Sequence, residues 1–312
     1  MSKSNHGEGA EEMAAVQPPG RSLPAPLPVG STSAPGPELS IVIPAYNEER
    51  RLAPTLEKIA AWMRANSLDA EVLVVDDGST DGMRGVVAKL AQTVPGLRLI
   101  SNGQNRGKGF SVRHGMREAR GRVALFTDAD LSAPIEEAAK LLTALDTAHV
   151  AFGSRAANRK LISVHQSPFR EIAGILFNRI VRAVLWIPFE DTQCGFKAFR
   201  MDRCRILFEQ QKIERFGFDP ELLFLAKHHG LRASEIPVRW AHDPDTKVNV
   251  YRDSMRMLLE LFVIRWNWLC GRYPRHAPSA HGQGEVPGEG GRANSGPASL
   301  PWARESFDRS KL

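Results

Sequence analysis

The chain has 312 residues, 42% of them hydrophobic, and a formal net charge of +6 at pH 7. This length and composition predict a globular protein with one large or two modest domains. The modest basic excess suits anionic ligands such as nucleotides, phosphates or an anionic membrane surface. No block of Lys and Arg marks a nucleic-acid-binding arm, so no nucleic-acid partner is expected.

The two ends of the chain differ in composition from its middle. Residues 1–38 are rich in proline, and residues 274–312 are rich in Gly, Pro, Ser and charge, so both are expected to be disordered tails around a domain at 39–273. The three cysteines form no CxxC pair, which favours a reduced, cytoplasmic setting. No secretory signal or membrane-spanning run is expected, because prolines break the N-terminal segment and charges interrupt the most apolar one.

From Leu39 the chain alternates short β-branched runs with helical patterns, which is typical of βαβ units and a mainly parallel sheet. The expected strands are 39–44, 71–77, 97–101, 123–128 and 149–155. The expected helices between them are 55–65, 109–119 and 135–145. Later elements are helices at 168–185, 202–210, 220–229 and 250–271, a short segment at 195–200, and a strand at 232–240. The predicted fold class is therefore α/β, Rossmann-like, with a mainly parallel central sheet flanked by helices.

Charged and polar residues follow four of the expected strands, at Pro44-Ala-Tyr-Asn-Glu, Asp76-Asp-Gly-Ser, Asp128-Ala-Asp and Gly153-Ser-Arg. Ligands of open parallel sheets bind beyond the carboxyl ends of the strands, so these residues should converge. The first of these turns, PAYNEERRLAP, has no glycine, which excludes a dinucleotide-binding fingerprint. SNGQNRGKGF lacks P-loop spacing, which makes ATP hydrolysis an unfavoured reading.

Two carboxylates, Asp128 and Asp130, stand one residue apart after an apolar strand. This spacing lets both approach one Mg²⁺ or Mn²⁺ ion, whose other ligands would include substrate phosphate oxygens. The alternative is a solvated turn in which Asp128 caps the next helix. In VDDGSTDG, Asp76 or Asp77 would accept a hydrogen bond from a base or ribose, with an ordinary strand-to-helix turn as the alternative.

Six motifs taken in order resemble the inverting family 2 glycosyltransferases with the GT-A fold. They are LSIVIPAYNEE, VLVVDDGSTDG, NRGKGFSVRHGM, FTDADLS, FGSR and DTQCGFKAF. More narrowly they are similar to the polyprenyl (dolichyl) phosphate glycosyltransferases, over about residues 39 to 273. DTQCGFK, with the later ERFGFDPELLFLAKHHG and EIPVRW, resembles the dolichyl-phosphate β-glucosyltransferase branch more than the mannosyl branch.

The resemblance implies roles for the residues that match its motifs. It implies that the nucleotide base and ribose are held by Pro44, Tyr46, Glu48 and Asp77. It implies that Asp128 and Asp130 hold the ribose, diphosphate and metal. In some relatives Gln or His follows the second Asp by two residues, where this chain has Ser132, a poorer ligand whose place water would fill.

Basic and acidic residues elsewhere in the matching segments are further candidates. Arg155 and Arg170 would face phosphates of the donor or acceptor, with a surface ion pair as the alternative. Lys108, Lys197 and Lys247 are further phosphate candidates that could equally be solvated lysines. Asp191 and Asp219 would orient the acceptor or the sugar.

The implied reaction is a metal-dependent, inverting transfer of a hexose to polyprenyl phosphate, with glucose from UDP-glucose expected ahead of any GDP-sugar. A phosphate acceptor is already anionic near neutral pH, since its second pKa is about 6, so no general base is obligatory. The alternatives are transfer of mannose, transfer to a saccharide hydroxyl, which would need a carboxylate base, and a non-catalytic nucleotide-sugar-binding protein.

A lipid acceptor requires contact with a membrane surface. The expected helices at 168–185 and 250–271 each combine an apolar stripe with nearby arginines. The stripes comprise Ile172, Ile175, Leu176, Ile180 and Val184, and then Met255, Leu258, Leu259, Phe262, Trp266 and Leu269. We expect most of each stripe to pack in the core and part of one to touch the membrane, with the enzyme peripheral at the cytoplasmic face.

Overall fold

The computed structural model describes residues 36–156, 162–164, 168–241 and 250–274. Its strands are β1 (Leu39–Ala45), β2 (Ala70–Asp76), β3 (Leu97–Ser101), β4 (Val123–Thr127), β5 (Val150–Ser154), β6 (Ile162–Val164), β7 (Phe196–Arg200), β8 (Ala233–Pro237) and β9 (Trp240–Ala241). Its helices are α1 (Glu49–Ala65), α2 (Met83–Leu90), α3 (Lys108–Glu118), the short 3₁₀ helix η1 (Ile135–Glu137), α4 (Ala138–Ala144), α5 (Pro168–Leu185), α6 (Met201–Gln210), α7 (Phe218–His228) and α8 (Val250–Leu269).

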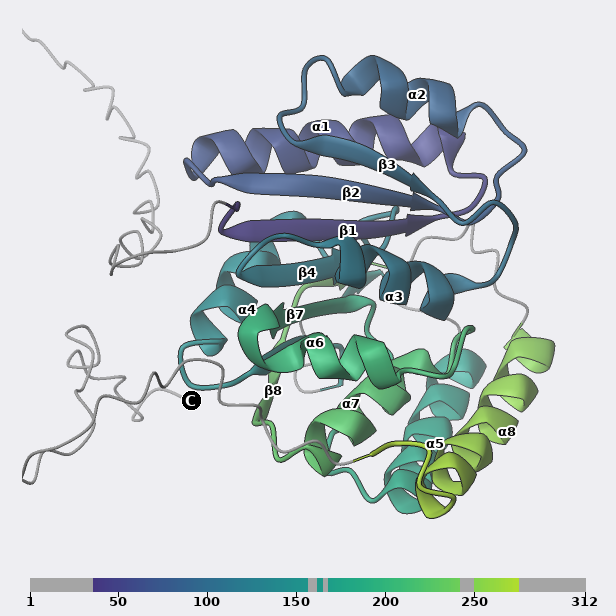
Figure 1. Cartoon of the computed structure of the whole chain (residues 1–312). Coiled ribbons are helices and arrows are strands. Elements are labelled where there is room, and N and C mark those ends of the chain that lie inside the picture. Colours follow the sequence, from purple (N-terminus) through teal and green to yellow (C-terminus); the bar gives the residue numbers. More distant parts are fainter. Residues whose placement is uncertain (1–35, 157–161, 165–167, 242–249, 275–312) are drawn as a thin grey trace, which may run out of the picture. The chain divides into compact units, whose positions relative to one another are not determined.

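The central sheet confirms the predicted fold class. Seven strands lie in the order β3-β2-β1-β4-β7-β5-β8 (Figure 1). β7 is antiparallel to its neighbours β4 and β5, and the other paired strands are parallel. β6 and β9 form a separate parallel pair. Six strands therefore run the same way and bring their carboxyl ends to one edge.

Both faces of the sheet are covered by helices, because the strands are apolar on both sides. In β1, Ile41 and Ile43 face a core that contains residues of α1, α2 and α4, whereas Val42 faces a core that contains residues of α3, α6, α7 and α8. Side chains alternate along a strand, so a single apolar run supplies both cores.

Several boundaries differ from those expected. α1 begins at Glu49, before Pro54, whereas the expected helix began at Thr55. The early start is held by the neighbouring loop: the Glu49 amide donates to Asp81 Oδ2 and the Gly82 amide donates to Glu49 Oε2. Neither α2 nor β6 was among the expected elements, and the expected strand 232–240 is divided between β8 and β9.

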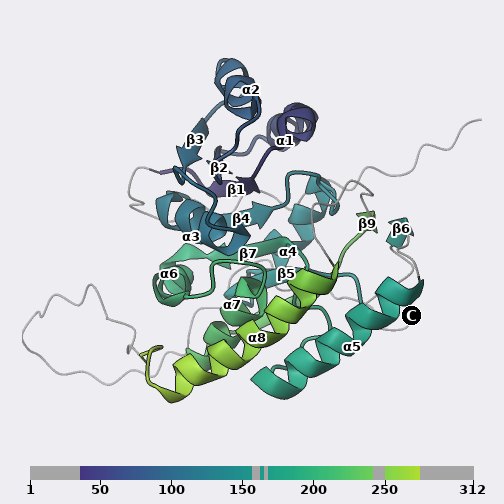
Figure 2. The ribbon, with the colours of Figure 1, turned by 90° about the vertical axis from the view of Figure 1, so that its right-hand side faces the viewer.

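α5 and α8 lie side by side and are remote from α1 and α2 (Figure 2). The expectation that most of the apolar stripe predicted in helix 250–271 packs inward is wrong, because five of its six residues are exposed and only Leu258 is partly buried. Leu261 and Ile264 supply the contact with the core, and the side of the helix that carries Leu259, Phe262 and Trp266 faces outward. Neither helix, nor any other in the described ranges, is long and apolar enough to cross a membrane.

Candidate active site

The carboxyl end of β4 carries the paired carboxylates. β4 and β7 run antiparallel with Thr127 opposite Phe196, so Asp128 follows β4 where Gly195 precedes β7. A Cβ atom on Gly195 would overlap the Asp128 carboxylate. Only glycine therefore leaves room for this carboxylate in its observed position. Gly195 lies within the DTQCGFK motif, but it was not among the predicted site residues.

Asp128 is paired with the first residue of α3. Its Oδ1 lies 2.5 Å from the Lys108 ammonium, and both side chains are partly exposed. A cation at a helix N-terminus opposes the helix dipole, so nearby carboxylates must compensate. Burial disfavours the charged lysine, but Asp128, followed by Asp219 and Asp130, raises the pKa of Lys108 overall. Lys108 is thus held among carboxylates, and its contact with a phosphate stays a prediction.

Asp130 lies in the turn that follows. Its Oδ1 accepts a hydrogen bond from the Ser132 amide at 2.9 Å, and Leu131 between them has a φ of +48°. Burial, and next the Asp128 carboxylate, raise the pKa of Asp130. Two crowded carboxylates of this kind favour a bound cation, which would relieve their repulsion.

The donor set fits Mg²⁺ or Mn²⁺ only if the nucleotide contributes. Within the described ranges, no group of three or more His, Cys, Asp or Glu side chains is arranged to hold a metal ion. Mg²⁺ commonly binds through one or two carboxylates and substrate phosphates. Asp128 and Asp130 match that requirement, and the backbone contact of Ser132 to Asp130 positions a carboxylate that would serve as a ligand.

A second ion pair lies buried beneath this cluster. The Lys197 ammonium donates to Asp219 Oδ1 at 2.6 Å and to the Cys194 carbonyl at 2.5 Å. Lys197 is fully buried, so it is not the solvated lysine that sequence reasoning left open. Burial raises the pKa of Asp219, although Lys197 and Lys108 oppose the shift. The Lys197 and Asp219 pair is therefore a buried structural ion pair beneath the Asp128 and Lys108 cluster.

Arg155 and Asp191 form a two-pronged ion pair. Arg155 donates from Nε and Nη2 to the two Asp191 oxygens at 2.7 and 2.9 Å, and its amide also donates to Asp191 Oδ2. Burial opposes the charge on Asp191, but Arg155 outweighs it and lowers the pKa of that carboxyl. The Glu235 carboxylate, missed by sequence reasoning, accepts the Asp191 amide at 2.8 Å. Asp191 is buried, so this is not the surface ion pair weighed from the sequence.

The two carboxylates at the carboxyl end of β2 bind the protein's own loops. Asp77 accepts hydrogen bonds from the Asn102 side chain and from the amides of Arg106 and Gly107, at 2.8 to 2.9 Å. Asp76 accepts the Ser79 amide at 2.8 Å and Arg84 Nε at 2.6 Å. Asp77 thereby fixes the loop that leads into Lys108. Contact of either aspartate with base or ribose stays a prediction.

The turn after β1 is joined to the turn after β2. Asn47, which was not among the predicted site residues, has a φ of +53° and accepts the Thr80 amide at 2.8 Å. Asn tolerates this left-handed conformation better than most residues, which is the signal in the sequence. Pro44 lies in β1, whereas Tyr46 is exposed and Glu48 lies 3.5 Å from Arg51.

Two predicted residues cannot be placed at the site. Lys247 lies outside the described residues, and Arg170 is described only as a position in α5. The residues brought into one charged cluster are Lys108, Asp128, Asp130, Lys197 and Asp219, with Arg155 and Asp191 forming the adjoining pair. The cluster joins β4, β7, α3 and α7, which are far apart in the sequence.

The sequence model described as glycosyl transferase family 2 matches residues 40–204. A dolichyl-phosphate beta-glucosyltransferase of Drosophila melanogaster is 37% identical over 257 residues, covering 77% of this chain and 78% of the relative. The protein of that name from Homo sapiens is 32% identical over 254 residues, with coverage of 77% and 78%. These relatives confirm the resemblance drawn from the six motifs.

Solved structures show the same fold. A glucosyl-3-phosphoglycerate synthase of Mycobacterium tuberculosis, in complex with Mn²⁺, UDP and glucosyl-3-phosphoglycerate, has a TM-score of 0.52 at 16% identity, covering 78% of this chain and 82% of the other. A mannosyltransferase of Pyrobaculum calidifontis, in complex with GDP-Man and Mn²⁺, has a TM-score of 0.50 at 22% identity, with coverage of 74% and 65%. These likenesses support the GT-A fold. The chain belongs to glycosyl transferase family 2, and it is a hexose-transferring enzyme of that family.

Proposed function

We propose that this enzyme transfers glucose from UDP-glucose to dolichyl or another polyprenyl phosphate, with inversion at the sugar and with a divalent cation. The curated relatives carry the name dolichyl-phosphate beta-glucosyltransferase, which supports the sugar and the acceptor. The UDP-bound and Mn²⁺-bound neighbour of the same fold supports the nucleotide and the metal. Action at the cytoplasmic face of a membrane is part of the proposal, because the acceptor is a lipid.

The main support for the proposal is that both candidate bases, Asp219 and Asp191, are already paired with basic side chains. Asp219 is paired with Lys197, and Asp191 is paired with Arg155. Both carboxylates are buried and already have a basic partner, which disfavours either of them as the acceptor of a proton from an incoming hydroxyl. An anionic phosphate needs no such base. The geometry therefore favours a phosphate acceptor over a saccharide hydroxyl.

The reaction balances without proton transfer. One oxygen of the lipid phosphate forms a bond to C1 of glucose, while the bond from C1 to the UDP oxygen breaks and its electron pair leaves with UDP. A single displacement of this kind inverts C1. Lys108 and Arg155 would neutralise developing charge on the phosphates and hold the reactants in line. Asp128 and Asp130 would hold the divalent ion, which when bound would stabilise the departing diphosphate.

The test is a transfer assay with radiolabelled UDP-glucose, UDP-N-acetylglucosamine and GDP-mannose, each with and without Mg²⁺ or Mn²⁺. Polyprenyl phosphate and an alkyl glucoside serve as the competing acceptors. We expect transfer from UDP-glucose to the lipid phosphate, dependent on the cation, and a β-linked product by proton NMR. Incorporation only from GDP-mannose would overturn the donor assignment, and transfer to the alkyl glucoside would overturn the acceptor assignment.

A further inference from the structure

The outward face of α8 is a continuous apolar stripe. Its members are Met255, Leu259, Phe262, Trp266 and Leu269, and each side chain is 60 to 66% exposed. Their spacing of four and three residues places them in one row along the helix. We call this row the α8 stripe. It runs along most of a helix whose opposite side is packed in the core.

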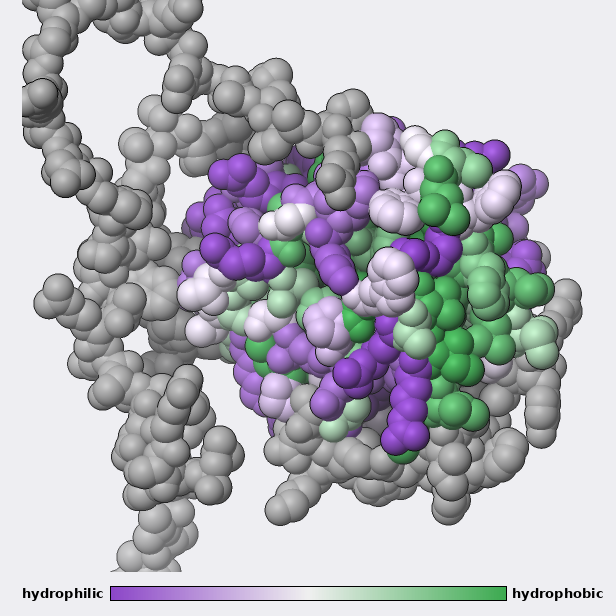
Figure 3. All heavy atoms as spheres, turned by 90° about the horizontal axis from the view of Figure 1, so that it is seen from below, coloured by the Kyte–Doolittle hydropathy of each residue, from purple (hydrophilic) through white to green (hydrophobic). Residues whose placement is uncertain are grey.

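The apolar surface continues onto the middle of the neighbouring helix α5 and onto Trp186, the residue that follows it. Ile175, Leu176 and Trp186 are 42, 57 and 65% exposed, and the Arg265 guanidinium lies 4.3 Å from the centre of the Trp186 ring. In the described part of the chain, nine of the eleven exposed large hydrophobic side chains belong to α5, α8 or Trp186. Figure 3 shows hydrophobic side chains gathered along one side of this face. Such concentration marks a binding surface, because scattered exposure is the usual condition of a protein surface.

Arginines border the apolar surface. Arg179, Arg182 and Arg256 are exposed on the same two helices. The acidic Glu260 is instead turned inward, where it accepts the Gly217 amide at 2.8 Å. Aromatic side chains beside arginines suit the boundary between lipid headgroups and acyl chains, where the rings enter and the guanidinium groups remain at the anionic headgroups.

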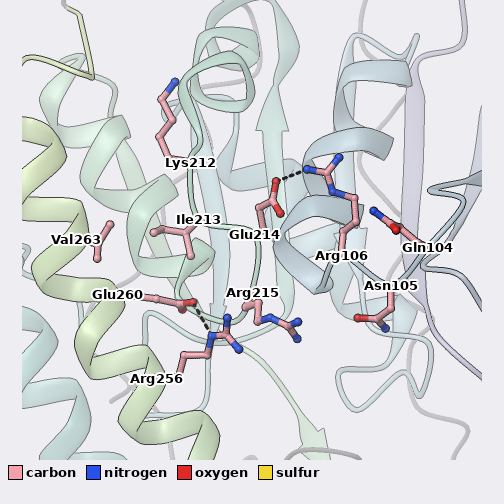
Figure 4. Close-up of a pocket in the computed structure, with 10 residues that line it drawn as sticks. All are labelled: Gln104, Asn105, Arg106, Lys212, Ile213, Glu214, Arg215, Arg256, Glu260 and Val263. Carbon is pink, nitrogen blue, oxygen red and sulfur yellow. Dashed lines mark hydrogen bonds and ion pairs between the residues drawn. The ribbon is translucent and has the colours of Figure 1, made fainter.

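The same helix adjoins the reaction site. One flank of α8 lines a hollow of about 580 Å³ through Arg256, Glu260 and Val263; its other lining residues are Gln104, Asn105, Arg106, Lys212, Ile213, Glu214 and Arg215 (Figure 4). The loop 104–106 leads into Lys108, whose ammonium contacts Asp128. Gln193, in the loop beside the Arg155 and Asp191 pair, donates to Met257 of α8 at 3.1 Å.

We propose that the α8 stripe, with Trp186 and the exposed Ile175 and Leu176 of α5, docks on an anionic lipid bilayer. Docking in this way places the hollow beside α8 at the level of the headgroups, where a lipid phosphate resides. That orientation rests on the proposed function, whereas the docking itself rests on the exposed residues. The helices lie in the interface and do not cross the bilayer.

The test is flotation of the full chain with vesicles of phosphatidylcholine and phosphatidylglycerol that contain no polyprenyl phosphate. The variant Phe262→Glu/Trp266→Glu should bind about 100-fold more weakly, since each lost aromatic contact is worth roughly tenfold. The matched control is Leu99→Glu, which changes an exposed apolar residue on β3, outside the stripe, and should bind as the wild type does. Brominated lipid should quench Trp266, and Trp266→Phe should lose that part of the quenching.

Transfer to a water-soluble short-chain prenyl phosphate separates the two proposals. The double variant should keep this activity and its thermal unfolding midpoint while losing vesicle binding. If the wild-type chain binds vesicles but transfers sugar from none of the donors, the docking proposal is supported and the proposed function is wrong. Equal flotation of variant and wild type would overturn the docking proposal, as would a dimer in light scattering that the double variant converts to monomer, since the stripe would then join two copies.

Discussion

Asp219 offers the sharpest test of how the site is built, because its carboxylate is the anionic partner of a fully buried lysine. Asp219→Asn keeps the shape of the side chain and removes its charge. At the observed separation of 2.6 Å, the Lys197 and Asp219 charges attract by about 6 kcal/mol at an effective dielectric constant of about 20. Loss of one member of a buried pair leaves the other uncompensated and typically costs about 3 to 5 kcal/mol of unfolding free energy.

A loss of this size should be visible in both urea and thermal unfolding. For a domain of this length it corresponds to a fall of roughly 10 °C in the unfolding midpoint. The double variant Asp219→Asn/Lys197→Met removes both charges, so it should recover most of the lost stability. Without this recovery, the Lys197 and Asp219 pair is not the cause of the instability.

The same variant decides whether Asp219 acts as a base. At a temperature where Asp219→Asn is folded, kcat for a polyprenyl phosphate acceptor should fall by less than about tenfold, because removal of a general base usually costs about 100-fold to 10,000-fold. A variant with wild-type unfolding free energy and a kcat reduced 1,000-fold would refute the reasoning. That outcome would assign proton transfer to Asp219 and favour a hydroxyl acceptor.

Two further predictions concern Gly195 and Glu221. Gly195→Ala should lower kcat on the order of 100-fold by displacing the Asp128 carboxylate, whereas Gly85→Ala, whose added Cβ meets no atom within 4 Å, should leave kcat unchanged; equal activity of the two variants would contradict the packing argument. Burial raises the pKa of Glu221 to about 7, so its protonated form should add about 3 kcal/mol of stability below pH 4.5, and this contribution should disappear as pH rises through 7. The free energy of unfolding, measured in urea from pH 4.5 to 7.5, should depend less on pH in Glu221→Gln than in the wild type. An equal pH dependence in the two proteins would contradict the raised pKa of Glu221.

The first five strands in chain order, and the strand ends that carry the candidate site residues, were accessible from the sequence. Apolar runs of β-branched residues predicted β3 with its observed bounds, and helical periodicity did the same for α5. The pair Asp128 and Asp130 stood out because two charges follow an apolar strand. These features are local, since side-chain alternation and backbone preference act over a few residues.

Other features needed the folded chain. No local pattern shows that Gly195 lies against Asp128, that Asp77 holds the loop 102–107, or that Lys197 is buried with Asp219. These contacts form only when β7 inserts between β4 and β5, when β3 pairs with β2, and when α7 packs on the sheet.

The α8 helix shows the same division between sequence and structure. The helical repeat in the sequence identified all five residues of the exposed stripe, and it also included Leu258, which packs against the core. Only the tertiary structure decided that the stripe faces outward, because inward packing by Leu261 and Ile264 occupies the other side of the helix. Periodicity identifies a face of a helix, but the packing of neighbouring elements decides whether that face is buried or left for a partner.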